Sequence, residues 1–208
     1  MEVDDEASGT ATHRGNRHGR SEHARLSVLQ AADDLLVERG YAQLTIEGIA
    51  ARAGVAKQTI YRWWSSKTDV LMDAFVEDAA EDLQPPDTGD LRRDLRAHLR
   101  QLAGFLADSD AGAVFRALAG EAQHDADLAE RLREEHLNHQ RARDRLPLQR
   151  AIERGQLSRR TDVDLAVDQL VGPIYYRVLV TGQPVPESFT DALVDTVLAG
   201  LRQPTSAR

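Results

Sequence analysis

The chain of 208 residues contains no cysteine, which excludes disulfides and thiolate metal ligands. It has no apolar run long enough to cross a membrane, and its N-terminus lacks the apolar centre of a secretory signal. The sequence also contains no GxSxG, P-loop or GxGxxG motif and no cysteine nucleophile. These absences lead us to expect a cytoplasmic protein that is not an enzyme, does not enter membranes and carries no cofactor.

The negative charge is unevenly distributed along the chain. The formal net charge is −8, which argues against a general nucleic-acid binder. Residues 1–20 carry a net −1 and residues 21–71 are neutral, so the remaining −7 lies in residues 72–208. An acidic C-terminal part would be repelled by DNA and would favour docking through the N-terminal part. The alternative is that the acidic residues serve only solubility, and both interpretations stand at this point.

The most informative segment is residues 45–71, which read TIEGIAARAGVAKQTIYRWWSSKTDVL. Its first part predicts a helix over 46–53, with apolar residues on one face at helical spacing. Thr45 has a hydroxyl that can cap this helix, and Gly54 suits the left-handed residue that ends it. A second helix is predicted over 57–64. This arrangement is a helix-turn-helix, whose second helix enters the major groove of DNA.

The same segment resembles the TetR family of transcriptional repressors, whose pattern is roughly T-x3-I-A-x2-A-G-V-x3-T-x-Y-x2-F-x2-K-x2-L. The chain departs from this pattern at Trp64, where the family usually has Phe, and at Trp63, where His or Tyr is common. Gly48 is also unusual, because a glycine inside a helix costs about 1 kcal/mol relative to alanine. The matching positions are Thr45, Ile49, Ala50, Ala53, Gly54, Val55, Thr59, Tyr61, Lys67 and Leu71.

The first turn of the second helix carries two long side chains suited to reading bases. Lys57 can donate to guanine O6 and N7, and Gln58 can pair with adenine N6 and N7. Tyr61 and Trp63 have polar tips that suit phosphate contacts, and Lys67 would share a phosphate with backbone N–H groups. The alternatives are packing for the aromatic residues, solvated surface for the long polar residues and a purely structural cap for the threonine. By resemblance, the DNA-binding residues are Thr45, Lys57, Gln58, Thr59, Tyr61, Trp63 and Lys67.

The rest of the chain shows helical periodicity and no convincing strand. We therefore expect an all-α protein of about nine helices. The resemblance divides it into an N-terminal three-helix DNA-binding domain with the helix-turn-helix (21–66) and a C-terminal helical ligand-binding and dimerisation domain (67–208). Ser66 and Asp69 predict a capping box where the second domain begins. The predicted helices span 21–39, 46–53, 57–64, 67–83, 90–107, 111–123, 127–154, 162–180 and 187–201.

Residues 1–20 are small, polar and charged without periodicity, so a disordered tail is expected. Its basic half could reach a minor groove, as the N-terminal arms of other DNA-binding proteins do. An idle, solvated tail is the simpler interpretation. The basic half consists of His13, Arg14, Arg17, His18 and Arg20.

A homodimer is expected because one helix-turn-helix buries too little surface for tight binding, and such proteins usually bind double-stranded DNA as dimers on a palindromic operator. The segments 162–180 and 187–201 carry more apolar area than one layer needs. In the family, the last two helices of each subunit form a four-helix bundle about a two-fold axis, which implies an isologous interface here. The alternative is that both helices are buried within a monomer.

The resemblance also implies a pocket for a small-molecule effector between residues 90 and 180. The effector would release a repressor by preferring a conformation in which the two recognition helices are wrongly spaced. Activation instead of repression, a dimeric regulator without an effector, and plain core packing of these residues are the alternatives. The candidate pocket residues are His98, Leu102, Phe105, Phe115, Arg116, Tyr175 and Tyr176.

A zinc site is a weaker hypothesis. Glu135, His136 and His139 share one predicted helix, and His124 is nearby in the sequence. Structural zinc sites require four closely spaced ligands, and no H-E-x-x-H pattern is present. We therefore expect a solvated charged face and no metal.

Overall fold

The computed structural model describes the backbone of residues 15–202 and the side chains of residues 21–79 and 83–201. The regular structure in these ranges is helical throughout, as predicted. The elements are α1 (Gly15–Arg39), the 3-10 turn η1 (Tyr41–Gln43), α2 (Ile46–Ala53), α3 (Lys57–Tyr61), α4 (Lys67–Asp82), α5 (Leu91–Asp108), α6 (Asp110–Glu121), α7 (Ala126–Leu132), η2 (Arg133–Leu137), α8 (Asn138–Glu153), α9 (Val163–Tyr176), η3 (Arg177–Thr181) and α10 (Glu187–Arg202).

The helices agree with the expected number. The segment η2 is π-helical and joins α7 to α8 without a break, and η3 likewise extends α9. Apart from the short turn η1, the described residues therefore form 9 continuous helical rods. None of these helices is long and apolar enough to span a bilayer.

The first helix begins earlier than predicted. α1 starts at Gly15, within the expected tail, instead of at Ser21. Adding residues to an existing helix costs much less than nucleating one, and no proline interrupts the chain between these two positions. Residues 1–14 lie outside the described residues. The side chains of the predicted basic arm are also outside them, namely His13, Arg14, Arg17, His18 and Arg20.

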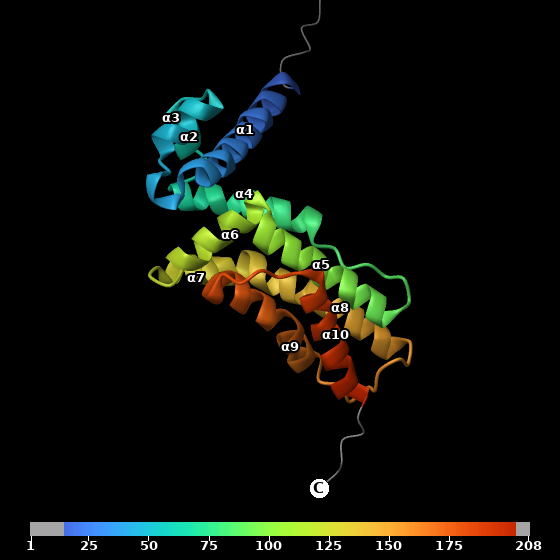
Figure 1. The fold of residues 1–208 in the computed structure, drawn as a ribbon. Coiled ribbons are helices and arrows are strands. Elements are labelled where there is room, and N and C mark those ends of the chain that lie inside the picture. The colour runs from blue at the N-terminus through green and yellow to red at the C-terminus, as the bar shows by residue number, and fades with distance from the viewer. Residues whose placement is uncertain (1–14, 203–208) are drawn as a thin grey trace, which may run out of the picture.

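The N-terminal unit of α1, α2 and α3 is built on an apolar core. One face of α1 contributes Val28 and Leu35, α2 contributes Ile49 and α3 contributes Ile60, and each of these side chains is almost completely buried. In Figure 1 this unit lies above the rest of the molecule, with α4 crossing beneath it. The long helix α1 and the two short helices α2 and α3 are joined through this core, which supports the surface of α3.

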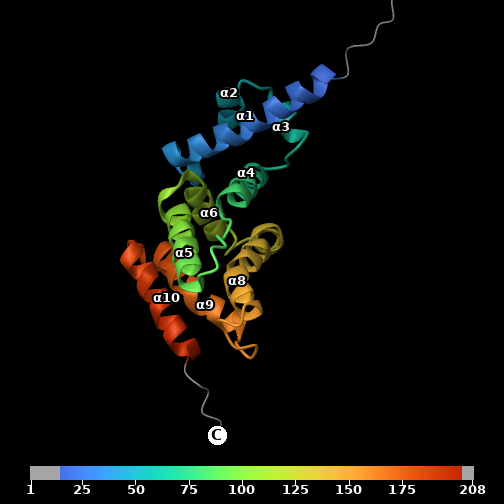
Figure 2. The ribbon, with the colours of Figure 1, turned by 90° about the vertical axis from the view of Figure 1, so that its right-hand side faces the viewer.

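α4 joins this unit to the helical body. It packs against α1 on one side and α6 on the other, as Figure 2 also shows. Its start is fixed by the predicted capping box: the Ser66 hydroxyl accepts the Asp69 backbone N–H at 3.2 Å, and the Asp69 carboxylate accepts the Ser66 N–H at 2.9 Å. Phe75 is fully buried in the middle of α4, with its ring centroid 5.4 Å from that of Phe115 on α6.

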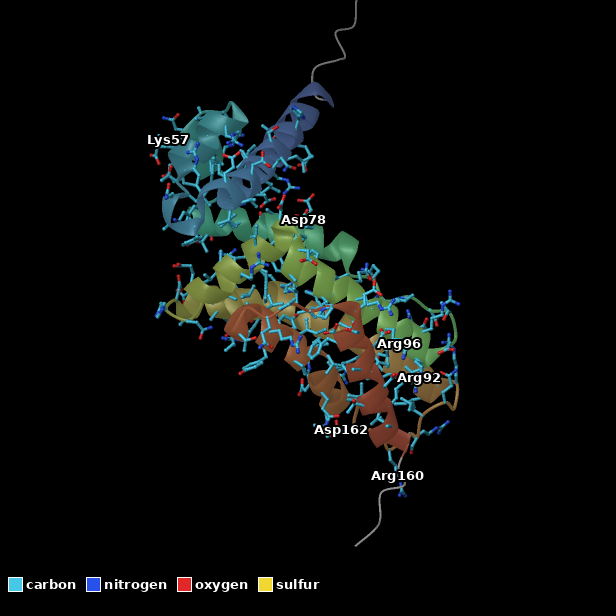
Figure 3. All side chains as sticks on the ribbon, viewed as in Figure 1. Lys57, Asp78, Arg92, Arg96, Arg160 and Asp162 are labelled. Atoms are coloured by element: carbon cyan, nitrogen blue, oxygen red, sulfur yellow. The ribbon has the colours of Figure 1, made fainter. Side chains whose placement is uncertain are left out.

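In the helical body, α10 is fixed to α5 by a ladder of ion pairs. Arg92, Arg96 and Arg100 stand one helical turn apart on α5. Arg92 pairs with Asp195, and Arg96 contacts the same carboxylate at 2.9 Å. Arg100 pairs with Asp191 at 2.7 Å. Figure 3 shows the first two arginines on the side of the body where α5 and α10 run together. Apolar residues of α10 lie beside α9, where they line a groove.

Candidate DNA-binding site

The corner of the helix-turn-helix forms as predicted. The Thr45 hydroxyl accepts the Gly48 backbone N–H at 3.1 Å and caps α2. Gly54 has a φ of 67° and ends α2, with its N–H bonded to the Ala50 carbonyl. Residues with a Cβ atom rarely adopt this left-handed backbone conformation, so glycine is the favoured residue here.

Gly48, the unusual residue of the motif, has a local explanation. A Cβ atom at this position would lie 3.3 Å from Thr45 Oγ1 and 3.7 Å from Leu35 Cδ1. The first distance is tighter than ordinary van der Waals contact. A side chain here would therefore press on the hydroxyl that caps α2, and the loss of helix propensity is offset by a close cap and a close approach of α2 to α1.

The second helix is shorter than predicted, because α3 ends at Tyr61 and not at Trp64. The chain tightens there: the Trp63 N–H donates to the Ile60 carbonyl at 2.9 Å, a bond that spans three residues. The turn brings the Trp64 ring into the core, where it is 4% exposed and its Nε1–H donates to Asp73 at 2.8 Å. A buried indole N–H requires such an acceptor, and this tertiary contact ends the helix.

The predicted base-reading residues lie on the exposed side of α3. Lys57 and Gln58 are exposed, and Tyr61 is 53% exposed. Figure 3 shows Lys57 at the outer edge of the N-terminal unit, at the end of the molecule remote from the body. Thr59 and Trp63 are half-buried. The residues therefore form one accessible face whose first turn carries the two long polar side chains.

Lys57 has a partner that the sequence did not suggest. Its ammonium contacts the carboxylate of Glu47 on α2 at 2.7 Å, and both side chains are more than half exposed. The hydrogen bond from Lys57 lowers the pKa of Glu47, and the carboxylate in turn raises the pKa of Lys57. Both groups are therefore charged at neutral pH.

Lys67 is held at the start of α4 by Tyr41. Its ammonium donates to the Tyr41 carbonyl at 2.7 Å and lies 4.0 Å from the centroid of the Tyr41 ring. The tyrosine hydroxyl bonds to Thr68 at 2.7 Å. An ammonium group has three donors, so two N–H bonds of Lys67 remain for a phosphate.

The candidate effector residues separate into distinct environments. Tyr175 lines a groove of about 520 Å³ between η2, α8 and α9, together with Gln140 and Asp144. Buried His98 does not line this groove but bonds to Asp144 at 2.8 Å, and Gln140 donates to the same carboxylate oxygen at 2.8 Å. Sequence reasoning missed Gln140 and Asp144, because both lie in a highly charged segment of α8.

The other candidates do not reach this groove. Leu102 and Phe115 are buried core residues, and the Phe115 ring separates Tyr175 from Phe75. Phe105 also packs near Phe75, with ring centroids 6.0 Å apart. Arg116 donates to the carbonyls of Leu106 and Ala107 at the end of α5. Tyr176 is 58% exposed and is not among the residues that line the groove.

The expectation of a solvated face around His136 is wrong. This side chain is 2% exposed, and its ring centroid lies 4.3 Å from that of Phe75. Burial lowers the pKa of His136 to about 4, so the imidazole is neutral at pH 7. His136 lies in the π-helical turn η2, and its ring packs against Phe75 and Phe115 of other helices. Glu135 bonds instead to Arg131, and His139 is exposed. The described side chains form no group of three or more potential metal ligands.

An exposed recognition helix behind a glycine corner, carried on an all-helical body, defines a helix-turn-helix transcriptional regulator. Comparison with protein families identifies which kind. Residues 28–74 match the model of bacterial regulatory proteins of the tetR family, and residues 85–197 match a tetracyclin repressor-like C-terminal domain. The chain belongs to the tetR family. Its relatives are transcriptional regulators and not enzymes.

Individual relatives extend over nearly the whole chain. The HTH-type transcriptional regulator YdeS of Bacillus subtilis is 39% identical over 188 residues, which cover 90% of this chain and 94% of that protein. The DNA-binding transcriptional repressor TetR of Mycobacteroides abscessus is 32% identical over 189 residues, which cover 89% and 97%. The crystal structure of the TetR family transcription regulator SCO0332 is similar with a TM-score of 0.73 and 39% identity, and covers 87% of this chain and 100% of that one.

Proposed function

We propose that the protein is a repressor that binds a palindromic operator as a homodimer and is released by a small-molecule effector. The observation that carries this proposal is the pair Lys57 and Gln58, exposed on the first turn of α3 at the outer end of the molecule. The name of the Mycobacteroides relative supports repression over activation. Because an operator is chromosomal DNA, the proposal implies a cytoplasmic protein.

The residues of this face take different roles on DNA. Lys57 and Gln58 read base edges, which specifies the sequence. Tyr61 contacts a phosphate through its hydroxyl, and Lys67 adds its two remaining N–H donors to the same strand, which positions the protein without specifying the sequence. Thr45 caps α2 and acts on DNA only through the placement of that helix. Thr59 and Trp63, which are half-buried, line the edge of the contact.

The proposed dimer interface is the apolar surface formed by α9 and α10. A groove of about 590 Å³ runs between these helices, and Leu165 on its rim is 54% exposed. A single chain leaves this surface in water, which favours a second copy over a monomer. Small residues allow the two copies to approach closely. The groove is lined by Leu165, Gln169, Phe189, Ala192, Leu193, Thr196, Val197, Gly200 and Leu201.

The proposed effector site is the groove beside Tyr175. Apolar walls from Leu137 and Val171 and polar groups from Gln140 and Asp144 make a surface of the kind that binds small molecules. Its wall η2 also touches α4, because the His136 ring packs at a tilt against that of Phe75. An effector that prefers a shifted η2 would therefore move α4 and with it the recognition helix.

DNA binding is tested by selecting duplexes from a random library and titrating the enriched fragment and a scrambled one. We expect the wild type to enrich a palindrome. Lys57→Ala and Gln58→Ala should lose sequence preference, whereas Lys67→Ala should weaken binding to both fragments alike. An equal loss on both fragments for Gln58→Ala contradicts a base-reading role.

The dimer is tested by sedimentation at micromolar concentration. Leu165→Glu should convert dimer to monomer, because it adds a charge to the apolar interface. Leu26→Glu is the matched control, since Leu26 is 44% exposed and belongs to α1, a helix that lies apart from α10 in Figure 1. A wild-type monomer, or a dimer that survives the first substitution, contradicts the proposed interface.

The effector site is tested by the thermal shift that a panel of small compounds produces. A compound that raises the Tm of the wild type should lose this effect in Tyr175→Ala and keep it in Tyr176→Ala, whose side chain lies outside the groove. If no compound shifts the Tm and none weakens operator binding, the protein is a dimeric regulator without an effector.

A further inference from the structure

The Glu47–Lys57 pair lies on the surface proposed to face DNA. Glu47 is the second residue of α2 and Lys57 the first residue of α3, so the pair bridges the two helices of the motif. The ammonium nitrogen and the carboxylate oxygen are 2.7 Å apart, with side-chain exposures of 51% for Lys57 and 63% for Glu47. The Glu47 carboxylate therefore lies within one hydrogen bond of the end of Lys57.

This pair has little part in holding the fold together. Ion pairs at such exposed positions contribute little to stability, and α2 and α3 are already joined through the buried side chains of Ile49 and Ile60. On a DNA-facing surface, however, a carboxylate has a cost, because the phosphates repel it on every sequence. Pairing with Lys57 reduces that repulsion, and a hydrogen-bond donor on a base edge offsets it further. A group of this kind gives specificity by rejecting wrong sequences.

A G·C base pair offers the pattern that the two side chains require. Guanine O6 and cytosine N4 lie side by side in the major groove and are hydrogen-bonded to each other, so they are about 2.9 Å apart. The Lys57 donor and the Glu47 acceptor have a similar separation of 2.7 Å. Guanine N7 beside O6 provides the ammonium with a second acceptor.

An A·T pair fits less well for two reasons. The carboxylate would have to face adenine N6, and the neighbouring adenine N7 is an acceptor that repels it. The ammonium would have to face thymine O4, where the neighbouring methyl group provides no acceptor. The same two side chains therefore discriminate between the two kinds of base pair.

We propose that Glu47 is a specificity-determining residue, and that Lys57 and Glu47 together read one G·C pair in each half-site. Lys57 donates to guanine O6 and N7 while Glu47 accepts from the cytosine N4 amino group. This inference rests on the proposed function, because it requires that α3 enters the major groove. It adds a base contact from α2, which carries none in the arrangement expected from the sequence.

The test compares the duplexes enriched by the wild type, Glu47→Ala, Glu47→Gln and Lys57→Ala, followed by titrations on the operator and on its G·C→A·T variant. In the wild type, the base-pair change should weaken binding roughly 5- to 150-fold, the range for one good bidentate contact. In Glu47→Ala most of this preference should disappear, and binding to scrambled DNA should become tighter. Glu47→Gln should retain part of the preference, because its amide oxygen still accepts a hydrogen bond.

Two further measurements separate base reading from simple tethering of the lysine. The double variant Glu47→Ala/Lys57→Ala should lose no more preference than either single variant, since one base pair is read jointly. Freeing Lys57 to bind a phosphate should also steepen the salt dependence of Glu47→Ala by about one unit of slope. The matched control is Glu38→Gln, which breaks the exposed 2.6 Å pair with Arg52 elsewhere on the unit and should change neither property.

The proposal is overturned if Glu47→Ala and Glu47→Gln both keep the wild-type preference at every position of the operator. In that case the carboxylate only holds the lysine in the free protein. If the wild-type protein enriches no palindrome, the proposed function fails together with this contact, and that outcome is distinct from the loss of the Glu47 contact alone.

Discussion

The N-terminal unit and the helical body differ in what they bury. Among the described side chains, the fully buried polar residues all lie in the body, and residues 21–66 contain none. The buried side chains of the N-terminal unit are apolar apart from the Trp64 indole N–H, and one oxygen of half-buried Asp33 is also buried. The buried polar residues of the body are Asp94, His98, His136, Gln140, Asp144 and Thr190.

This difference fits two different tasks. An apolar core can support a recognition surface without burying polar groups, and the residues that would recognise DNA then lie on the surface. Burying polar groups is costly unless they are hydrogen-bonded, and the body contains ring nitrogens of His98 and His136 that have no partner. The body accepts this cost close to the groove of Tyr175, where a bound molecule would need polar groups. Four substitutions test the contrast, starting with the largest expected effect.

Phe75→Ala should have the largest effect, because this ring lies where the two regions meet. It is fully buried and contacts Phe105, Phe115 and His136. We expect the free energy of unfolding to fall by about 3–5 kcal/mol, the usual cost of such a cavity. Urea denaturation measures it, with half-buried Val76→Ala as a milder control. A loss below that of the control would mean that the two regions are not joined through this ring.

His136 tests the polar burial of the body through pH. Its pKa is about 4 when folded and about 6.5 when unfolded, so the unfolded chain binds the proton more readily. The contribution of His136 to the free energy of unfolding is fully present above pH 6.5. It falls by about 3 kcal/mol as the pH decreases to 4. His136→Phe should remove this component from the pH profile of unfolding. An unchanged profile would show that the imidazole is solvated.

Asp33 tests the exception within the N-terminal unit. One of its oxygens is buried without a partner, and burial, together with the charges of Asp78, Asp34 and Asp110, raises its pKa to about 7. Asp78 lies on α4 at the junction, as Figure 3 shows. A raised folded-state pKa means that stability is lost as the pH rises from about 4 to 7. Asp33→Asn should therefore stabilise the protein by about 1–3 kcal/mol at pH 8 and much less at pH 4. Equal effects at both pH values would contradict this assignment.

Ser66→Ala should have the smallest effect of the four. It removes the hydroxyl that caps α4, which typically costs about 1 kcal/mol. Thermal unfolding should show a small decrease in Tm, and Ser66→Thr should restore it because threonine also provides a hydroxyl. If alanine causes no loss, α4 is fixed by its tertiary packing and not by its cap.

Local chemistry explains which features could be predicted. The cap of Thr45, the glycine corner and the capping box at Ser66 each depend on residues within three or four positions, so their geometry was readable from the sequence. The end of α3 was not, because it depends on an acceptor for the Trp64 indole that stands on α4. The Glu47–Lys57 contact also requires the corner to fold before the two side chains meet.

The candidate effector residues show the same limit. Tyr175 and Tyr176 are adjacent in an apolar helix, yet one lines the groove and the other is exposed. Apolar residues surround both positions, so helical periodicity gave no way to separate them. Arg116 was expected in the pocket and instead binds backbone carbonyls at the end of α5, which no pattern of side chains indicates.

The sequence by itself determined that the protein is all-helical and that it carries a helix-turn-helix, because periodicity, caps and turns act over a few residues. Only the tertiary structure decided which polar residues are buried in the body and which carboxylate meets the recognition helix. Those outcomes depend on how separate helices pack, and packing brings together residues whose distance along the chain carries no local signal.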